Sequence, residues 1–191
     1  MKYKYIPTTK NELKIATIQE IVEQGMTADL NCINTSLITD MSYMFRSSNF
    51  NGNISNWDVS NVTDMRCMFE GSKFKGDISS WNVSGVTNMR CMFLGSSFNG
   101  DISNWDMSGV TDISFMFSGS EFNGDVSKWD VSRVTDMSWM FAKSKFNNDI
   151  SNWVVGDECK TEGMYDDCKI NPRFKHGYVD MGEGIDVDDL Y

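Results

Sequence analysis

The sequence predicts an α/β repeat solenoid of the leucine-rich-repeat type, and the spacing of its aromatic residues supports this prediction. Tryptophan recurs every 24 residues without insertion or deletion, at Trp57, Trp81, Trp105, Trp129 and Trp153. Two phenylalanine series follow the same period: Phe45, Phe69, Phe93, Phe117 and Phe141, and Phe50, Phe74, Phe98, Phe122 and Phe146. A fixed period of this length is typical of repeat architectures, so each unit is expected to form one coil of a stack.

Each unit combines two local patterns, as residues 62–84 (VTDMRCMFEGSKFKGDISSWNVS) illustrate. Val62, Met65 and Phe69 share one face at helical spacing, which predicts a short helical turn that Gly71 ends. The residues from Phe74 onward follow a strand-like pattern interrupted by a glycine–aspartate turn signal. One short parallel strand plus one short helical turn per repeat is the leucine-rich-repeat rhythm.

The loss of this pattern at both ends predicts three regions. Residues 33–165 are expected to form the solenoid, with five repeats and a degenerate sixth that ends at Met164 and Tyr165. Residues 1–32 are predicted to contain a capping helix, because Thr9 and Glu12 have the spacing of a capping box. Residues 166–191 are interpreted as a C-terminal cap and an acidic tail. The residues expected to cover the first coil form an apolar stripe: Leu13, Ile15, Ile18, Ile21 and Val22.

The charge and the cysteine usage limit the function and the location. A net charge of -10 and a pI near 4.5 argue against direct nucleic-acid or anionic-membrane binding, because both need a basic surface. An acidic surface instead favours solubility, cations or a basic partner. Neither a signal-type apolar region nor a membrane-length apolar run is present. Five cysteines without a CxxC pair favour reduced thiols and a cytoplasmic location, the host cytoplasm if the protein is virus-encoded. A surface location stays open if a signal peptide was trimmed.

The sequence has few residues suited to catalysis or to cofactor binding, so we expect no enzyme activity and no cofactor. The single histidine, His176, lies in the degenerate segment and is interpreted as a solvated surface residue. The sequence contains no glycine-rich phosphate-binding motif. Three acidic ladders follow the repeat, and asparagine replaces aspartate on each of them. Such substitution favours hydrogen bonding in turns over calcium coordination, so no metal site is predicted. The ladder in the GDIS motif comprises Asn53, Asp77, Asp101, Asp125 and Asp149.

The predicted partner-binding residues occupy the second position after the first methionine of each repeat, or after Ile113 in the repeat where isoleucine replaces that methionine. They lie opposite the core face of the predicted helical turn, so they are expected to form an exposed apolar stripe. The alternatives are that neighbouring loops cover this stripe or that it reflects tolerated variation. Two members of this stripe, Cys67 and Cys91, are predicted to lie within disulfide reach of one another, although free thiols are favoured. The stripe consists of Tyr43, Cys67, Cys91, Phe115 and Trp139.

The repeat motif also resembles a known family. The segments PTTKNELKIA (7–16), ITDMSYMF (38–45) and NVTDMRCMFEGSKFKGDISSWNVS (61–84) resemble the BspA-like leucine-rich-repeat family, named earlier after mycoplasma lipoprotein repeats of unknown function. The similarity covers residues 7–165. It implies a repeat solenoid that acts in adhesion or host-protein contact, often on microbial surfaces, with similar arrays in viral and phage proteins. The family supplies no catalytic residues.

Three functions are consistent with these observations. The leading hypothesis is a non-catalytic protein–protein interaction module that binds a partner through exposed solenoid surfaces. The second is a phage- or virus-encoded acidic inhibitor that acts as a decoy and blocks a basic groove of a host defence protein. The third is a microbial surface adhesin whose signal has been removed. The sequence predicts neither the partner nor the oligomeric state.

Overall fold

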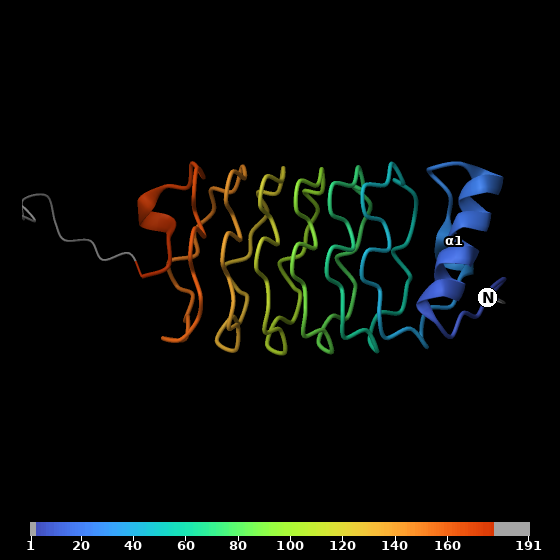
Figure 1. The fold of residues 1–191 in the computed structure, drawn as a ribbon, viewed down its shortest axis with the longest axis horizontal. Helices are drawn as coiled ribbons and strands as arrows, with labels where there is room; N and C mark the ends of the chain where they lie inside the picture. The colour runs from blue at the N-terminus through green and yellow to red at the C-terminus, as the bar shows by residue number, and fades with distance from the viewer. Residues whose placement is uncertain (1–2, 178–191) are drawn as a thin grey trace, which may run out of the picture.

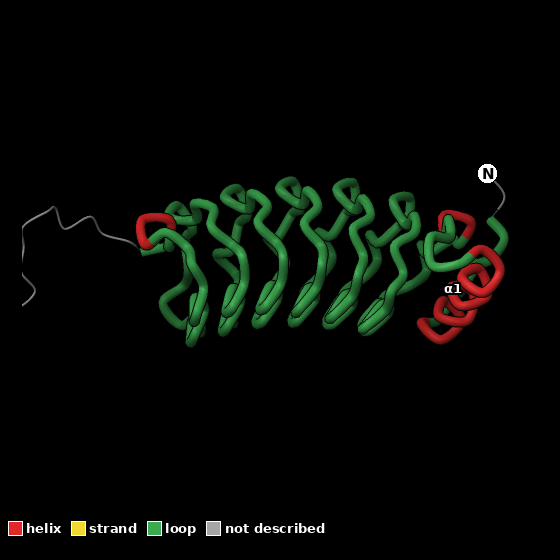
Figure 2. The backbone as a smooth tube through the Cα atoms, turned by 90° about the horizontal axis from the view of Figure 1, so that it is seen from above, coloured by secondary structure: helices red, strands yellow, loops and turns green. Residues whose placement is uncertain are grey.

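The computed structural model describes residues 3–177 and shows successive coils stacked along one axis (Figure 1). Helix α1, Lys10–Gln24, lies across the N-terminal end of the stack, as Figure 2 shows from above. Two short 3-10 helices complete the regular elements, η1 (Leu30–Cys32) and η2 (Pro172–Phe174). None of the helices in residues 3–177 is both long and apolar enough to cross a membrane. The predicted acidic tail, residues 178–191, lies outside the described residues.

Helix α1 begins after the N-cap residue Thr9 that the sequence predicts. The Thr9 hydroxyl accepts a hydrogen bond from the Glu12 N–H at 3.2 Å, and the Glu12 carboxylate accepts one from the Thr8 N–H at 2.7 Å. These bonds satisfy N–H groups that have no partner within the helix. Gly25 has a φ of 85°, which glycine adopts at little cost, and ends the helix.

The face that α1 buries differs from the predicted one. Leu13, Ala16, Thr17 and Glu20 are buried against the first coil. Of the predicted apolar stripe, only Leu13 is buried and Ile21 is partly buried, whereas the other three side chains point to solvent. Glu20 explains why the buried face of α1 differs from the predicted one. The Lys4 ammonium donates a hydrogen bond to the Glu20 carboxylate, so this acidic residue is accommodated on the packed face. The exposed members of the stripe are Ile15, Ile18 and Val22.

The core consists of columns of identical side chains, one from each coil. Phe69 and Phe93 stack with ring centroids 5.6 Å apart, and within one coil Phe69 and Phe74 lie 4.6 Å apart. Each repeat tryptophan is buried and donates its indole N–H to a carbonyl of the previous coil, as Trp105 does to Ile78 at 3.2 Å. The core therefore combines aromatic packing with a hydrogen bond that fixes the register of neighbouring coils. Tyr165 continues the column, 6.3 Å from Phe141.

The backbone of each coil differs from the predicted strand and helical turn. Across residues 3–177, neighbouring coils share single parallel bridges, such as Asp64 with Asn88, and no strand is formed. The predicted helical turn is a run of tight turns, because Cys67 has a φ of 55°, outside the helical region. The leucine-rich-repeat class stays a prediction, as do the domain boundaries at residues 32 and 165.

Hydrogen bonds within and between coils alternate along these turns. The N–H groups of Met68 and Glu70 bond to carbonyls three residues back, while those of Met65, Cys67 and Phe69 donate to the next coil at 2.9 Å. Both kinds of bond repeat in every coil, so the buried backbone is satisfied without a regular sheet. In each coil the residue with a left-handed φ occupies the same position of these turns, so these residues form a column along the stack.

Candidate functional site

The five predicted partner-binding residues share one backbone conformation, and we call them the αL column. Their φ angles lie between 55° and 61°, in the left-handed region that side-chain-bearing residues rarely adopt. Each N–H donates to a carbonyl of the following coil, over distances from 2.8 to 3.0 Å. These bonds hold the residues in a conformation that an isolated chain would avoid. The members are Tyr43, Cys67, Cys91, Phe115 and Trp139.

Exposure varies along the αL column, contrary to the expectation of a continuous exposed stripe. Tyr43 is 39% exposed, and Phe115 and Trp139 are partly exposed. Cys67 and Cys91 are buried, with 8% and 9% of their surfaces accessible. The expectation of exposure was wrong for the two cysteines, because it rested on a helical turn that the structure does not contain. The predicted stripe is thus divided into an N-terminal and a C-terminal part.

The two cysteines of the αL column also have thiols of low reactivity. Burial raises the pKa of Cys67 to about 12, and it raises the pKa of Cys91 as well. A thiol with a raised pKa holds little of the thiolate that reacts with electrophiles and disulfides at neutral pH. All five cysteines are free thiols in the structure. Cys67 and Cys91 therefore serve packing and are unsuited to a reactive site.

Phe115 and Trp139 form the C-terminal part, the aromatic pair. Their rings stack with centroids 6.2 Å apart and planes 9° from parallel. Trp139 lies over Gly163, the residue at the same position of the degenerate repeat, where an added Cβ would come within 2.6 Å of the indole ring. Gly163 has a φ of 60°, so this position combines left-handed backbone with space for the ring.

Small side chains surround the aromatic pair along the chain. The Ser118 N–H donates to the Phe115 carbonyl, and the Ala142 N–H donates to the Trp139 carbonyl, both at 3.2 Å. Each of these bonds closes a tight turn. On the N-terminal side, the Arg90 guanidinium lies 5.0 Å from the Phe115 ring centroid. Several neighbours of the two rings in the sequence have short side chains, and both rings keep part of their surface exposed. The short neighbours are Ser114, Ser118, Ser138 and Ala142.

Tyr43 has a different, basic environment at the other end of the column. The Lys10 ammonium lies 5.6 Å from its ring centroid, and the Arg46 guanidinium lies 5.7 Å from it. Lys10 also donates to the Asp40 carboxylate at 3.1 Å, which connects α1 to the first coil. Tyr43 therefore takes part in fixing the cap, whereas the aromatic pair has no such structural contact to α1.

The aspartate ladders form hydrogen-bonded turns. In the GDIS motif, one Asp77 carboxylate oxygen accepts bonds from the Ser79 N–H at 2.9 Å and from the Ser79 hydroxyl at 2.7 Å. These bonds lower the pKa of Asp77, and the same arrangement lowers that of Asp101, Asp125 and Asp149. The contacts agree with the turn interpretation of the ladders. No group of metal-binding side chains was found among residues 3–177.

His176 is not the solvated residue that the sequence predicts. Its Nδ1 lies 2.8 Å from the Tyr165 hydroxyl, and the side chain is partly buried. Burial lowers the pKa of His176 and raises that of Tyr165. A neutral imidazole accepts the tyrosine hydrogen bond, so this pair closes the C-terminal end of the core. Both residues lie in the degenerate segment, where no repeat pattern indicates their contact.

The fold and this surface define a tandem-repeat protein, built from coils that superpose identical side chains. The chain belongs to the family described as "Mycoplasma protein of unknown function, DUF285", which matches residues 16–121 and 95–171 in two overlapping stretches. Neither the comparison with curated proteins nor that with solved structures produced a significant match.

Two further residues contribute to the site and were missed in the sequence. Gly163 supports the indole ring of Trp139, and Arg90 covers one side of Phe115. Aligning the degenerate repeat with the others would have placed Gly163 in the αL column, so a signal for it exists. Arg90 carries no comparable signal, because its contact depends on the conformation of the turn.

Proposed function

We propose that this chain is a non-catalytic binding scaffold whose protein partner docks on the aromatic pair. The supporting observation is that two large rings, stacked 6.2 Å apart, stand partly exposed on a backbone fixed by hydrogen bonds to the next coil. Aromatic side chains held in one conformation lose little entropy on binding and are enriched among residues that dominate binding energy. We further propose that the repeats are of the BspA-like leucine-rich type.

The aromatic pair fits this role better than the rest of the αL column. Cys67 and Cys91 are too buried to be reached, and Tyr43 is engaged by two cations of the cap and the first coil. Phe115 and Trp139 stack on each other and are both partly exposed, and Arg90 covers one side of the Phe115 ring. A partner with an apolar or aromatic group could therefore pack across both rings and displace the water that covers them.

The experiment is partner capture followed by an affinity measurement. Wild-type protein retains a specific protein from a lysate of the native host, which is identified by mass spectrometry and then purified. Phe115→Ala/Trp139→Ala is expected to weaken binding of this purified partner by at least about 30-fold, as loss of two anchors of about 1 kcal/mol or more each implies. The control is Val154→Ala/Leu37→Ala, which trims two exposed apolar residues elsewhere, 73% and 54% exposed. Equal loss in both double variants, or no loss in the first, would remove the aromatic pair from the proposal.

A second candidate is an acidic decoy that occupies a basic groove, and the aspartate ladders favour it. Asp77, Asp101 and Asp125 are exposed, and their lowered pKa values keep them charged at neutral pH. Binding through these rows would weaken steeply between low and moderate salt, because exposed charges are screened. Binding through the aromatic pair would change little over the same range. The salt dependence of the purified complex therefore separates the two functions.

A further inference from the structure

Helix α1 presents a second apolar face, opposite the one that packs on the first coil. Ile15, Ile18 and Val22 are 57%, 59% and 79% exposed. They follow the spacing i, i+3, i+7, the seam along which two helices pack against each other. Soluble proteins seldom leave three large aliphatic side chains in line on one helix, and such a face indicates an interaction surface.

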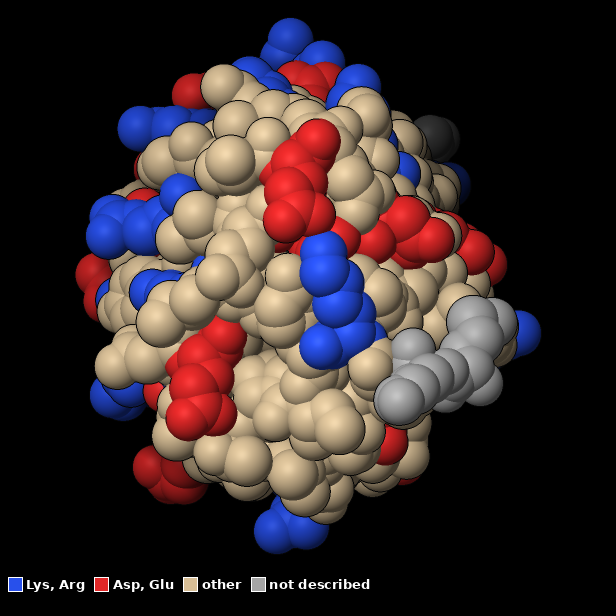
Figure 3. Space-filling view, turned by 90° about the vertical axis from the view of Figure 1, so that its right-hand side faces the viewer, with Lys and Arg blue, Asp and Glu red and all other residues tan. Residues whose placement is uncertain are grey.

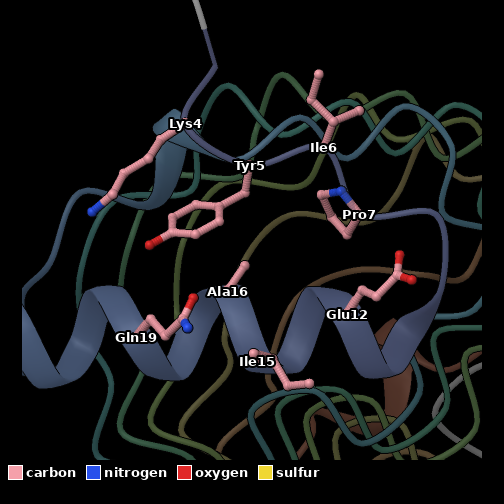
Figure 4. Close-up of a pocket in the computed structure, with 8 residues that line it drawn as sticks. All are labelled: Lys4, Tyr5, Ile6, Pro7, Glu12, Ile15, Ala16 and Gln19. Atoms are coloured by element: carbon pink, nitrogen blue, oxygen red, sulfur yellow. The ribbon is translucent and has the colours of Figure 1, made fainter.

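A groove extends this face along one side of α1. The N-terminal segment runs beside the helix, and a space of about 350 Å³ lies between them, bordered by Ile6, Pro7, Ile15 and Ala16 (Figure 4). Ile6 is itself 61% exposed. Viewed from this end, the molecule shows mostly uncharged surface with a few separate charged side chains (Figure 3). Because charges of both signs lie on this end face, a second copy of this acidic protein would meet less repulsion there than on a face that carries acidic residues alone.

The charges beside the seam indicate how a second helix would align. Helical periodicity places Lys14 on one flank of the stripe and Glu12 and Glu23 on the other. Glu23 is already paired with Lys4 at 2.9 Å, whereas Lys14 makes no ion pair within the described part of the chain. When two identical helices pack in parallel about a two-fold axis, opposite flanks meet, and Lys14 of each copy comes to the level of Glu12 of the other. In an antiparallel pair, the two acidic flanks would meet instead.

We propose that two copies of this chain associate through α1, with the helices parallel and the two stacks extending in opposite directions. If Ile6 and the three side chains of the exposed stripe each expose about 100 Å², the four side chains contribute about 400 Å² per copy and about 800 Å² for two copies, each side chain being worth about 2–3 kcal/mol at about 25–30 cal/mol per Å². Two copies would therefore bury somewhat less than the 1,200 Å² or so at which stable interfaces begin, which gives a weak, concentration-dependent dimer. This inference does not depend on the proposed function, because the aromatic pair lies on the coils.

Sedimentation velocity of the full chain over a wide concentration range tests the dimer. Wild-type protein is expected to shift from monomer to dimer as the concentration rises from about 1 μM to about 1 mM, the range of weak complexes. Ile18→Asp is expected to raise the dissociation constant at least about 10-fold, since it places a carboxylate in the seam. Val154→Asp adds the same charge at another exposed apolar residue, 73% exposed, and is expected to leave the dimer unchanged. Ile18 is exposed, so thermal unfolding should confirm that both variants fold.

The alignment of the helices is tested by a cysteine cross-link. Val22→Cys in a parallel dimer places the two new thiols opposite each other, so oxidation is expected to produce a covalent dimer. In an antiparallel dimer each new thiol would instead face Ile15 of the other copy. A dimer that persists but does not cross-link would therefore contradict the parallel arrangement. A wild-type chain that stays monomeric throughout, or an equal effect of Ile18→Asp and Val154→Asp, would overturn the proposal. Neither result depends on whether the aromatic pair binds a partner.

Discussion

The indole ring of Trp139 packs directly over Gly163, the residue one coil further along the αL column. An added Cβ at Gly163 would lie 2.6 Å from the ring, closer than side chains approach in folded proteins. Gly163 also has a φ of 60°, which favours glycine. This contact fixes the last ring of the column and with it the aromatic pair, so its loss should affect both stability and binding.

Gly163→Ala is expected to lower the free energy of unfolding by about 2–4 kcal/mol, because left-handed strain adds to a steric clash with the ring. Gly119→Ala is the matched control: Gly119 has a φ of 62° but nothing within 4 Å of an added Cβ. The loss of unfolding free energy for Gly119→Ala should be about 1–2 kcal/mol, the cost of the left-handed strain alone. Urea unfolding monitored by circular dichroism measures both values. Equal losses would show that Trp139 moves aside at no cost.

Trp105→Phe tests the hydrogen bonds between coils. The indole N–H of Trp105 donates to the buried carbonyl of Ile78 at 3.2 Å, and phenylalanine cannot replace this donor. The variant is expected to lose about 2–4 kcal/mol of unfolding free energy, from the unsatisfied carbonyl and the smaller ring. Trp139→Phe, which removes no indole hydrogen bond in the described structure, should lose less than about 1 kcal/mol. If Trp139→Phe loses as much unfolding free energy as Trp105→Phe, the role given to the indole hydrogen bonds is contradicted.

Acid should destabilise the stack through the aspartate turns. Hydrogen bonds from Ser127 lower the pKa of Asp125 below its ordinary value of 3.8, so the carboxylate is favoured in the folded protein. A carboxyl group with a lowered pKa contributes stability above about pH 4 that disappears as the pH falls through the folded value. Asp125→Asn keeps an acceptor for the Ser127 N–H and cannot be protonated in this range. Its unfolding free energy should fall less between pH 5 and about pH 2 than that of the wild type; parallel pH profiles would contradict this.

The contact between His176 and Tyr165 should make the C-terminal end of the core sensitive to pH. Burial lowers the pKa of His176 below 6.5, so the neutral form is favoured when the protein is folded. Protonation then favours opening, and the stability that the neutral ring provides is lost as the pH falls below about 6.5. Hydrogen exchange of residues 164–170 should accelerate between pH 7 and about pH 5 after correction for intrinsic rates. His176→Phe should abolish the change, and its persistence would assign the pH dependence to other groups.

The sequence predicts the architecture of the stack better than the conformation of its coils. The period of Trp57 and Phe45 indicates which side chains superpose, because a repeat that buries them needs neighbours in register. The predicted strand and helical turn are not formed in the described residues, although Met65 and Phe69 share a helical spacing, because the tight turns of each coil also bury both side chains. Cys67 carries no signal for a left-handed φ, because the hydrogen bonds that impose it come from the next coil.

The candidate site was predicted only in part for the same reason. Phe115 and Trp139 could be recognised as aromatic residues outside the core series, and the structure places them together. Burial of Cys67 and exposure of Ile18 depend on how coils and cap pack, which no local pattern records. On α1 the buried Glu20 needs Lys4, a residue outside the helix, so the helical stripe alone selected the wrong face.

Side-chain oxidation footprinting of the complex with the purified partner tests the binding role of the aromatic pair most directly. Hydroxyl radicals modify accessible aromatic rings, and mass spectrometry reports each residue separately. Partner binding is expected to reduce oxidation of both Phe115 and Trp139 several-fold while leaving Tyr43 and the exposed residues of α1 unchanged. Unchanged oxidation of the two rings, with protection elsewhere on the chain, would contradict the proposal.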